Sequence, residues 1–197
     1  MLQATLERQQ ALDRRLIQQC FGKVAEDLSM LLDRPLACAQ IEIARARRRV
    51  AGEKVVHVAF RFAVTVDGVL RHGALLVPLP EAIAMACYLM MMANDVVAAR
   101  RKDRDMERAT KDALLEVGNL IGGSLDCAIR EVFPRRTATR SEGCQGLKPG
   151  FAPAFPRASD EEHVVARATL TLHEYPGFDA WLMLPAIEET EADSLSS

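Results

Sequence analysis

The sequence predicts a single domain of the mixed α/β class, of the α+β type, in which helices pack against antiparallel strands. Two long segments, Leu6–Leu32 and Met106–Phe133, repeat apolar residues at the i, i+3, i+4, i+7 spacing of an amphipathic helix. Each of them is followed mainly by strand-like sequence. The chain has 197 residues, 49% hydrophobic and 26% charged, which suits one globular domain with its own core.

The first half of the chain is expected to form a long helix, or a broken pair of helices, followed by three strands. Pro35 marks the end of the helix, because proline cannot continue one. Asp67-Gly68 is the strongest hairpin signal in the chain, so the strands on either side of it are expected to pair. The expected elements are a helix at Leu6–Leu32 and strands at Leu36–Val50, Val55–Val66 and Val69–Leu79.

The second half begins with an apolar helix, Glu81–Arg100, that starts after Pro80. Since it is apolar nearly all round, we expect it to be buried in a core or in a dimer contact. After the long helix of this half, Arg135–Gly150 is expected to be a loop or an edge segment. Strands are expected at Phe151–Phe155, His163–His173 and Phe178–Leu184. The domain is thus expected to span residues 1–187, with an acidic, disordered tail at residues 188–197.

The two long helices are related by an offset of about 101 residues, which indicates an internal duplication. Gly22 then falls on Gly123. The apolar residues coincide as well, with Leu16 on Val117, Val24 on Leu125, Leu28 on Ile129, Leu31 on Val132 and Leu32 on Phe133. We therefore expect two roughly antiparallel helices that are related by a pseudo-twofold axis and pack against antiparallel strands.

One face of the second long helix carries three polar residues and then a glycine. At roughly 100° per residue, Asp112, Glu116 and Asn119 lie within about 60° of one another, away from the apolar stripe. Gly123 follows on the same line, directly after Gly122, and glycine inside a helix costs about 1 kcal/mol relative to alanine. The glycine pair indicates close approach of another group to the helix backbone. For the polar residues alone, a solvated outer face is the simpler interpretation.

The order of these residues resembles the signature of the CheC/CheX/FliY phosphatases of bacterial chemotaxis. Leu115–Gly123 is similar to that family's E-x-x-N-x-x-x-G core, in which Glu116, Asn119 and Gly123 take the defined positions. Leu28–Leu36 also resembles the stretch that follows the family's first site. The resemblance runs from about Leu12 to Leu184, and it implies one pseudo-twofold domain.

The first site of the family pattern is degenerate in this chain. Ala11, Arg15 and Gln18 stand at the positions that match the acid, acid and amide of the second site. The family includes members with one usable site, so this departure reduces the expected capacity to a single site, on the second long helix.

The resemblance implies a substrate and a role for each residue of the second site. The family acts on phosphorylated CheY-type response regulators, whose aspartyl phosphate is hydrolysed by in-line attack of water with a magnesium ion held by the regulator. Asn119 would position the water, because an amide both donates and accepts hydrogen bonds. Glu116 would pair with the cationic side chain beside the phosphate. Asp112 would contribute docking or helix orientation, and Gly123 would leave room for the regulator. No cofactor of the chain's own is implied.

Two further classes of protein stay open at this point. A binding module of the same fold would recognise a regulator, or a motor or receptor-pathway partner, without turnover. A helical scaffold unrelated to this family is the third possibility. The intact pair of Glu116 and Asn119 favours the enzyme. A CheD-like deamidase is a candidate partner by the same resemblance, and a homodimer stays open.

Composition excludes several other functions. The net charge of −2 gives no bulk field for nucleic acid or a membrane surface. The longest apolar run, Ala82–Ala93, is shorter than the roughly 20 residues that span a bilayer, and no signal peptide is visible, so a cytoplasmic protein is expected. The five cysteines include no C-x-x-C and the four histidines are scattered, so neither disulfides nor a metal site is expected. The basic cluster Arg45–Arg49 is interpreted as a charged strand edge rather than a docking patch.

Overall fold

The computed structural model describes residues 2–47, 50, 52, 54–134, 136–155 and 161–188. In chain order its elements are α1 (Leu2–Leu32), β1 (Leu36–Ala46), β2 (His57–Val66), β3 (Val69–Pro78), α2 (Leu79–Leu89), α3 (Asn94–Arg100), α4 (Arg108–Val132), β4 (Thr137–Leu147), β5 (His163–Leu172) and β6 (Phe178–Pro185). The strands form one six-stranded sheet in the order β1-β5-β6-β3-β2-β4, and every neighbouring pair is antiparallel. The predicted α+β class is confirmed.

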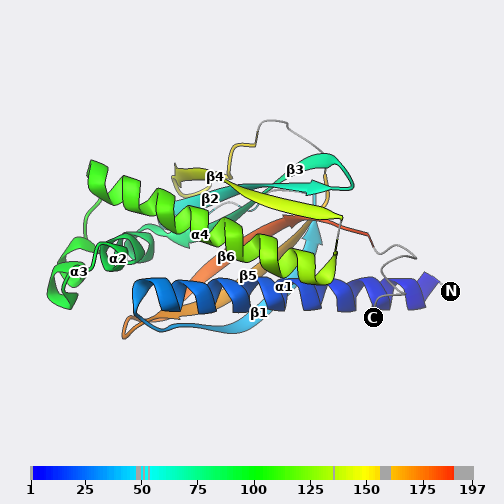
Figure 1. Ribbon diagram of the computed structural model, residues 1–197, viewed down its shortest axis with the longest axis horizontal. Coiled ribbons are helices and arrows are strands. Elements are labelled where there is room, and N and C mark those ends of the chain that lie inside the picture. The colour runs from blue at the N-terminus through cyan, green and yellow to red at the C-terminus, as the bar shows by residue number, and fades with distance from the viewer. Residues whose placement is uncertain are drawn as a thin grey trace.

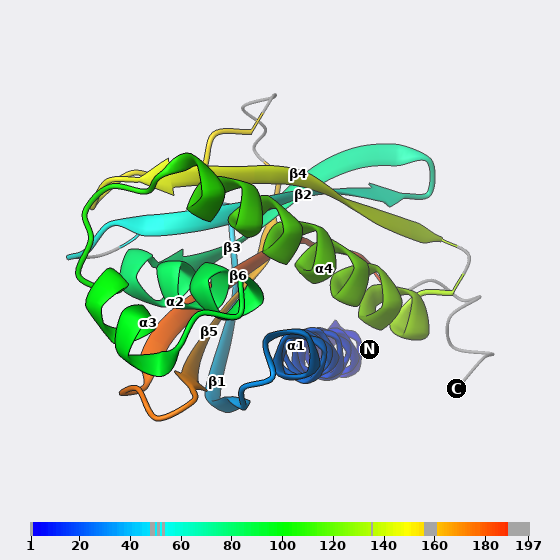
Figure 2. The same ribbon diagram turned by 60° about the vertical axis from the view of Figure 1, so that its left-hand side comes forward.

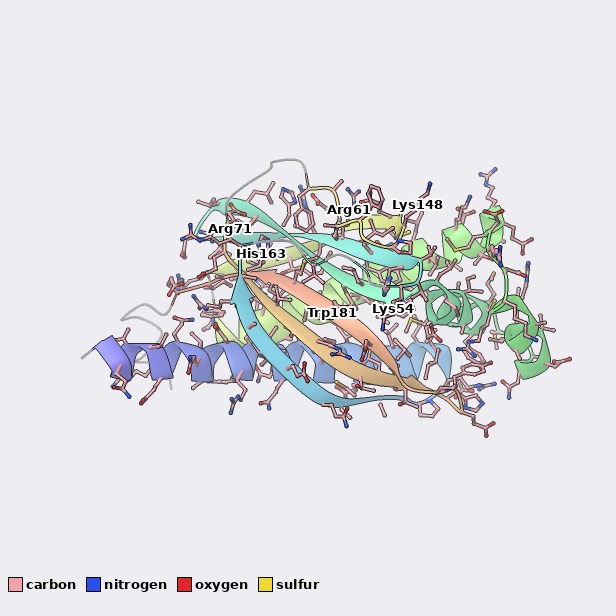
Figure 3. All side chains as sticks on the ribbon, turned by 180° about the vertical axis from the view of Figure 1, so that it is seen from behind. Lys54, Arg61, Arg71, Lys148, His163 and Trp181 are labelled. Atoms are coloured by element: carbon pink, nitrogen blue, oxygen red, sulfur yellow. The ribbon has the colours of Figure 1, made fainter. Side chains whose placement is uncertain are left out.

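The helices lie on one side of the sheet. α1 and α4 run side by side in opposite directions across this face, and α2 and α3 lie at one end of it (Figures 1 and 2). The main hydrophobic core fills the space between these helices and the sheet. A smaller cluster around Leu76, Val165 and Met183 lies on the opposite face, where Trp181 is partly buried (Figure 3).

The sheet order shows the predicted pseudo-twofold symmetry. Exchanging β1 with β4, β2 with β5 and β3 with β6 reverses the order and leaves the sheet unchanged. Local contacts repeat in the same way. His57 begins β2 and lies opposite Pro78, and His163 begins β5 and lies opposite Pro185. The Nδ1 atom of each histidine lies about a hydrogen-bond length from the carbonyl oxygen two residues before it, at 2.9 and 3.0 Å.

Both edge strands carry an irregularity at equivalent places. The β1–β5 register shifts between Ala39 and Glu42, and the β2–β4 register shifts opposite the stretch from Ser141 to Cys144. A residue in the left-handed region lies in each, Gln40 with φ of 51° and Gly143 with φ of 82°. β-Bulges of this kind interrupt a free edge and limit uncontrolled pairing. The halves therefore match in detail as well as in outline.

The apolar helix predicted at Glu81–Arg100 is divided in two, so that prediction is wrong in its extent. α2 ends at Leu89, and Met91 adopts the left-handed conformation with φ of 58°. The N–H of Met91 donates to the carbonyl of Tyr88 and the N–H of Met92 to that of Cys87, which closes the helix end. The burial predicted for this segment is confirmed for α2, where residues from Ala82 to Cys87 are almost wholly inaccessible.

Other boundaries differ from the predictions as well. α1 is one continuous helix, and β1 ends at Ala46 rather than at Val50. Of the two alternatives for Arg135–Gly150, the edge segment is confirmed, because β4 forms one edge of the sheet. No strand forms at Phe151–Phe155. This segment is held instead by two hydrogen bonds, in which the Arg61 guanidinium donates to the carbonyl of Ala154 and the N–H of Ala154 donates to Oε1 of Gln145. The predicted tail lies outside the described residues apart from Glu188.

Candidate functional site

The candidate site is the exposed strip of α4 formed by Asp112, Glu116, Asn119 and Gly123, here called the α4 strip. All four residues are exposed. The opposite side of the helix is buried in the core at Ala113, Leu114, Val117, Ile121, Leu125, Ala128, Ile129 and Val132. The amphipathic pattern thus orients the helix and leaves the strip on the outer surface, as predicted.

The central two residues of the α4 strip are free of internal partners. Within the described part of the chain, the side chains of Glu116 and Asn119 take part in no hydrogen bond and no ion pair. Asp112 lies 3.8 Å from the guanidinium of Arg108, one turn before it, and both side chains are exposed. Such a surface pair contributes little stability. The polar groups of Glu116 and Asn119 are therefore available to a binding partner.

The glycines of α4 have two different roles. A Cβ atom added at Gly122 would lie 2.9 Å from the backbone nitrogen of Ser141, and one added at Gly118 would lie 3.2 Å from the ring of Phe60. These two glycines let the chain's own β4 and β2 approach the helix. At Gly123 an added Cβ would meet nothing within 4 Å, so its backbone is open to the outside. The close approach expected from the glycine pair occurs at Gly122, inside the protein.

Two neighbours of the α4 strip were not predicted from the sequence. Leu115 is 42% exposed next to Glu116, although it is a large apolar side chain. Beyond Gly123 a shallow depression of about 460 Å³ continues along the helix, lined by Gly123, Asp126, Cys127, Arg130 and Glu131. Its residues follow Gly123 at the helical spacing, and that spacing is the signal by which they could have been found.

Ordinary nucleophiles and metal ligands do not gather at the strip. In the described residues no group of three or more His, Cys, Asp or Glu is placed to hold a metal ion. All five cysteines are free thiols. Cys144 lies on β4 near α4, and its burial raises the pKa of the thiol, which keeps it protonated near neutral pH. The polar groups of the α4 strip itself are two carboxylates and an amide, and the exposed thiol of Cys127 lies beyond Gly123 in the adjoining depression.

The pseudo-twofold axis places a second strip on α1, formed by Ala11, Arg15, Gln18 and Gly22 and here called the α1 strip. All four residues are exposed, and an added Cβ at Gly22 meets nothing within 4 Å. Its geometry therefore matches that of the α4 strip. Its chemistry differs, because a cation stands where the other strip has Glu116.

Comparisons with solved structures identify the class of fold. FliY from Thermotoga maritima superposes with a TM-score of 0.63 at 16% identity, over 87% of this chain and 86% of that one. A chain of the FliG–FliM complex from H. pylori gives a TM-score of 0.67 at 10% identity, over 96% of this chain and 98% of that one. CheX from Desulfovibrio desulfuricans gives 0.53 at 14% identity, over 86% and 99%.

The chain has the fold that these chemotaxis and flagellar proteins share. The resemblance predicted from Glu116, Asn119 and Gly123 is thereby confirmed at the level of fold. No protein-family model and no curated protein sequence matches the chain. Among the helices in the described residues, none is both long and apolar enough to cross a bilayer.

Proposed function

We propose that the chain is a phosphatase for the aspartyl phosphate of a CheY-type response regulator in the cytoplasm, acting through the α4 strip. The observation that carries this proposal is the pair formed by Glu116 and Asn119. They lie one turn apart on an exposed helix face, without internal partners, beside the open backbone of Gly123. Neither side chain makes a hydrogen bond or an ion pair within the described chain, so no polar contact assigns either of them a structural role.

The reaction needs positioning more than it needs a reactive side chain. An aspartyl phosphate is hydrolysed when water attacks phosphorus in line with the bond to the carboxylate, which then leaves as the free aspartate. The water's protons pass to the phosphate product and the solvent. The magnesium ion that neutralises the phosphoryl oxygens belongs to the regulator. Asn119 can hold the attacking water through its amide without placing a negative charge beside the phosphoryl group.

Glu116 is suited to hold the regulator rather than the water. Its exposed carboxylate can form a charge-assisted bond with a lysine beside the phosphorylated aspartate. Asp112 lies one turn further along the helix and supplements docking, while its weak pair with Arg108 is easily exchanged. Gly123 allows the regulator's backbone to approach α4 without meeting a side chain.

A non-catalytic binding module is the alternative that a specific observation favours. FliM has the same fold and occurs in a complex with FliG and in another with SpeE, so protein binding is a use of this fold. The α1 strip has also lost the acid and the amide. In this alternative the α4 strip would bind a regulator, a motor protein or a CheD-like deamidase without hydrolysis.

The decay of regulator phosphate separates the two functions. Purified CheY-like regulators are phosphorylated with a small phosphodonor, and the loss of phosphate is followed with and without the protein. The enzyme accelerates decay catalytically, whereas the module binds the phosphorylated regulator and leaves its lifetime unchanged.

Glu116→Ala is expected to reduce both binding and rate, because it removes the charge-assisted contact. Glu174→Ala, which removes an exposed carboxylate between β5 and β6 and outside both the α4 strip and the adjoining depression, serves as the control. Equal decay with the parent protein and with buffer alone rules out the phosphatase.

A further inference from the structure

A groove separates α1 from the edge strand β1. Two adjoining hollows of about 710 and 310 Å³ lie between these elements, and both are lined by Arg14 and Ile43. The larger one extends toward Leu6 and Arg45, and the smaller one toward Gln18 and Ile41. Together they form one continuous groove, here called the α1 groove, along the first half of the helix.

Residue size at two equivalent positions explains why the groove exists on this side. On α4, Gly118 and Gly122 let the helix approach its neighbouring strands closely. The offset of about 101 residues places Ile17 and Phe21 at the same positions of α1. Both side chains are buried, at 0% and 2% exposure, so they fill the space between α1 and the sheet and keep the helix away from β1.

The strand beside the groove has a free edge. β1 is the outermost strand and pairs only with β5 among the described strands, and Figure 3 shows it at the rim of the sheet next to α1. The irregularity at Gln40 interrupts this edge. The regular part that remains is Glu42–Ala46, which lies along the larger hollow. Backbone groups on such an edge can bond an added strand.

The sign of the charge changes along the larger hollow, from Arg14 at its junction with the smaller hollow to the surroundings of Arg45. Arg14 lines both hollows and forms no ion pair with any described residue. In the part of the larger hollow away from that junction, Arg45 is surrounded by three carboxylates, with distances of 2.6 Å to Asp13, 3.3 Å to Glu162 and 2.7 Å to Glu188. One arginine cannot neutralise three carboxylates, so the cluster formed by these four side chains has an excess of negative charge.

We propose that the α1 groove binds an extended peptide segment of a partner protein as an additional strand on Glu42–Ala46. Alternate side chains of a strand face the same way, so three of five consecutive residues meet the groove. An acidic side chain meets Arg14, an apolar one rests on Ile43 and Leu6, and a basic one meets Glu188, which lines the larger hollow. The α1 groove lies beside α1, so this inference is independent of the function proposed for α4.

The probe is a fluorescent pentapeptide with the sequence Asp-Thr-Val-Thr-Lys, together with its reversed sequence because either strand direction can pair. Anisotropy titration with the full chain is expected to show saturable binding of one of the two. Arg14→Glu should weaken that binding about tenfold or more, since it replaces an attraction by a repulsion. Arg140→Glu, the same change on the other edge strand, should leave it unchanged.

Backbone methylation tests the added strand directly. N-methylation of one alternate set of peptide residues removes the donors that face β1 and should abolish binding, whereas methylation of the other set should not. Insensitivity to both sets, or to Arg14→Glu, overturns the proposal. If the peptide binds a shortened protein that ends at Glu188 but does not bind the full chain, the groove belongs to the chain's own residues 189–197. If the protein forms a dimer that Arg14→Glu converts to monomers, the groove binds a second copy of the chain. Either of these two results also overturns the proposal.

Discussion

The two halves of the molecule keep one backbone plan and differ at a few side chains. α1 and α4 expose equivalent strips, and the strands behind them follow the same order in opposite directions. The polar positions have nevertheless diverged from Glu116 and Asn119 to Arg15 and Gln18. Exposed positions contribute little to stability, so they are free to change without damage to the fold. The comparison teaches that the exposed chemistry of one half can differ from that of the other while the architecture of both persists.

The buried positions of the two helices differ for another reason. Gly118 and Gly122 allow close packing of α4 on the sheet, whereas Ile17 and Phe21 hold α1 further out. The size of these side chains fixes the spacing between helix and sheet in each half. Protein interiors are close-packed, so a cavity or an added group there costs stability. Exchanging side-chain size at equivalent positions therefore tests the comparison directly.

The largest loss of unfolding free energy is expected for Phe21→Ala. The ring is almost completely buried between α1 and the sheet, so its removal leaves a cavity. Substitutions of this kind cost about 3–5 kcal/mol of unfolding free energy. Denaturant unfolding measures the loss. A cost below about 1 kcal/mol would mean that α1 collapses onto β1, as α4 does onto β4, and that the spacing is not fixed by this side chain.

A smaller effect is expected for Gly122→Ala, the equivalent position on α4. The new methyl group would lie 2.9 Å from the backbone nitrogen of Ser141, which has little freedom to move. Overpacking of this kind typically costs about 1–3 kcal/mol. Gly123→Ala is the matched control, because its methyl group meets open space and should stabilise the helix by up to about 1 kcal/mol. Equal effects of the two substitutions in unfolding experiments would refute the packing account.

The smallest effect concerns His57, whose counterpart in the other half is His163. Burial lowers the pKa of His57 below its ordinary value of about 6.5, despite the hydrogen bond to Val55. Between the lowered pKa and 6.5 the unfolded chain binds more protons than the folded one, so stability falls as the pH decreases through this window.

The measurement is the unfolding midpoint at several pH values between about 7.5 and 5. His57→Gln should reduce the loss of stability on acidification. The same substitution at His163 measures how far the second half shares this behaviour. If the stability of His57→Gln depends on pH in the same way as that of the parent protein, His57 is not the source of the loss on acidification.

Much of the fold was predictable because strong local patterns agree with it. The apolar periodicity of the long helices, the offset between them and the Asp67-Gly68 turn each specify structure through nearby residues. Exposure of the α4 strip followed from the same periodicity, since burying Leu114, Val117 and Ile121 leaves Glu116 and Asn119 outside.

The remainder depends on contacts between distant segments. β4 has an ambiguous sequence, because Gly143 and Gly146 weaken strand propensity, and its pairing with β2 decides its structure. The end of α2 could not be seen because Met91 takes a backbone conformation that glycine usually adopts. The α1 groove was invisible as well. The sequence signal for the groove is that α1 has large residues at two positions where α4 has glycines. This signal predicts a groove only when it is known which strand lies beside each helix.

Regulator-phosphate decay with Asn119→Ala beside Gln18→Ala tests the central claim, that the α4 strip acts and the α1 strip does not. Both residues are exposed at equivalent positions, so both variants should fold like the parent. Asn119→Ala should still bind the phosphorylated regulator and lose about a hundredfold in acceleration, because the attacking water is no longer positioned. Gln18→Ala should accelerate decay like the parent. Parent-like acceleration by Asn119→Ala, or an equal loss in both variants, would contradict the account.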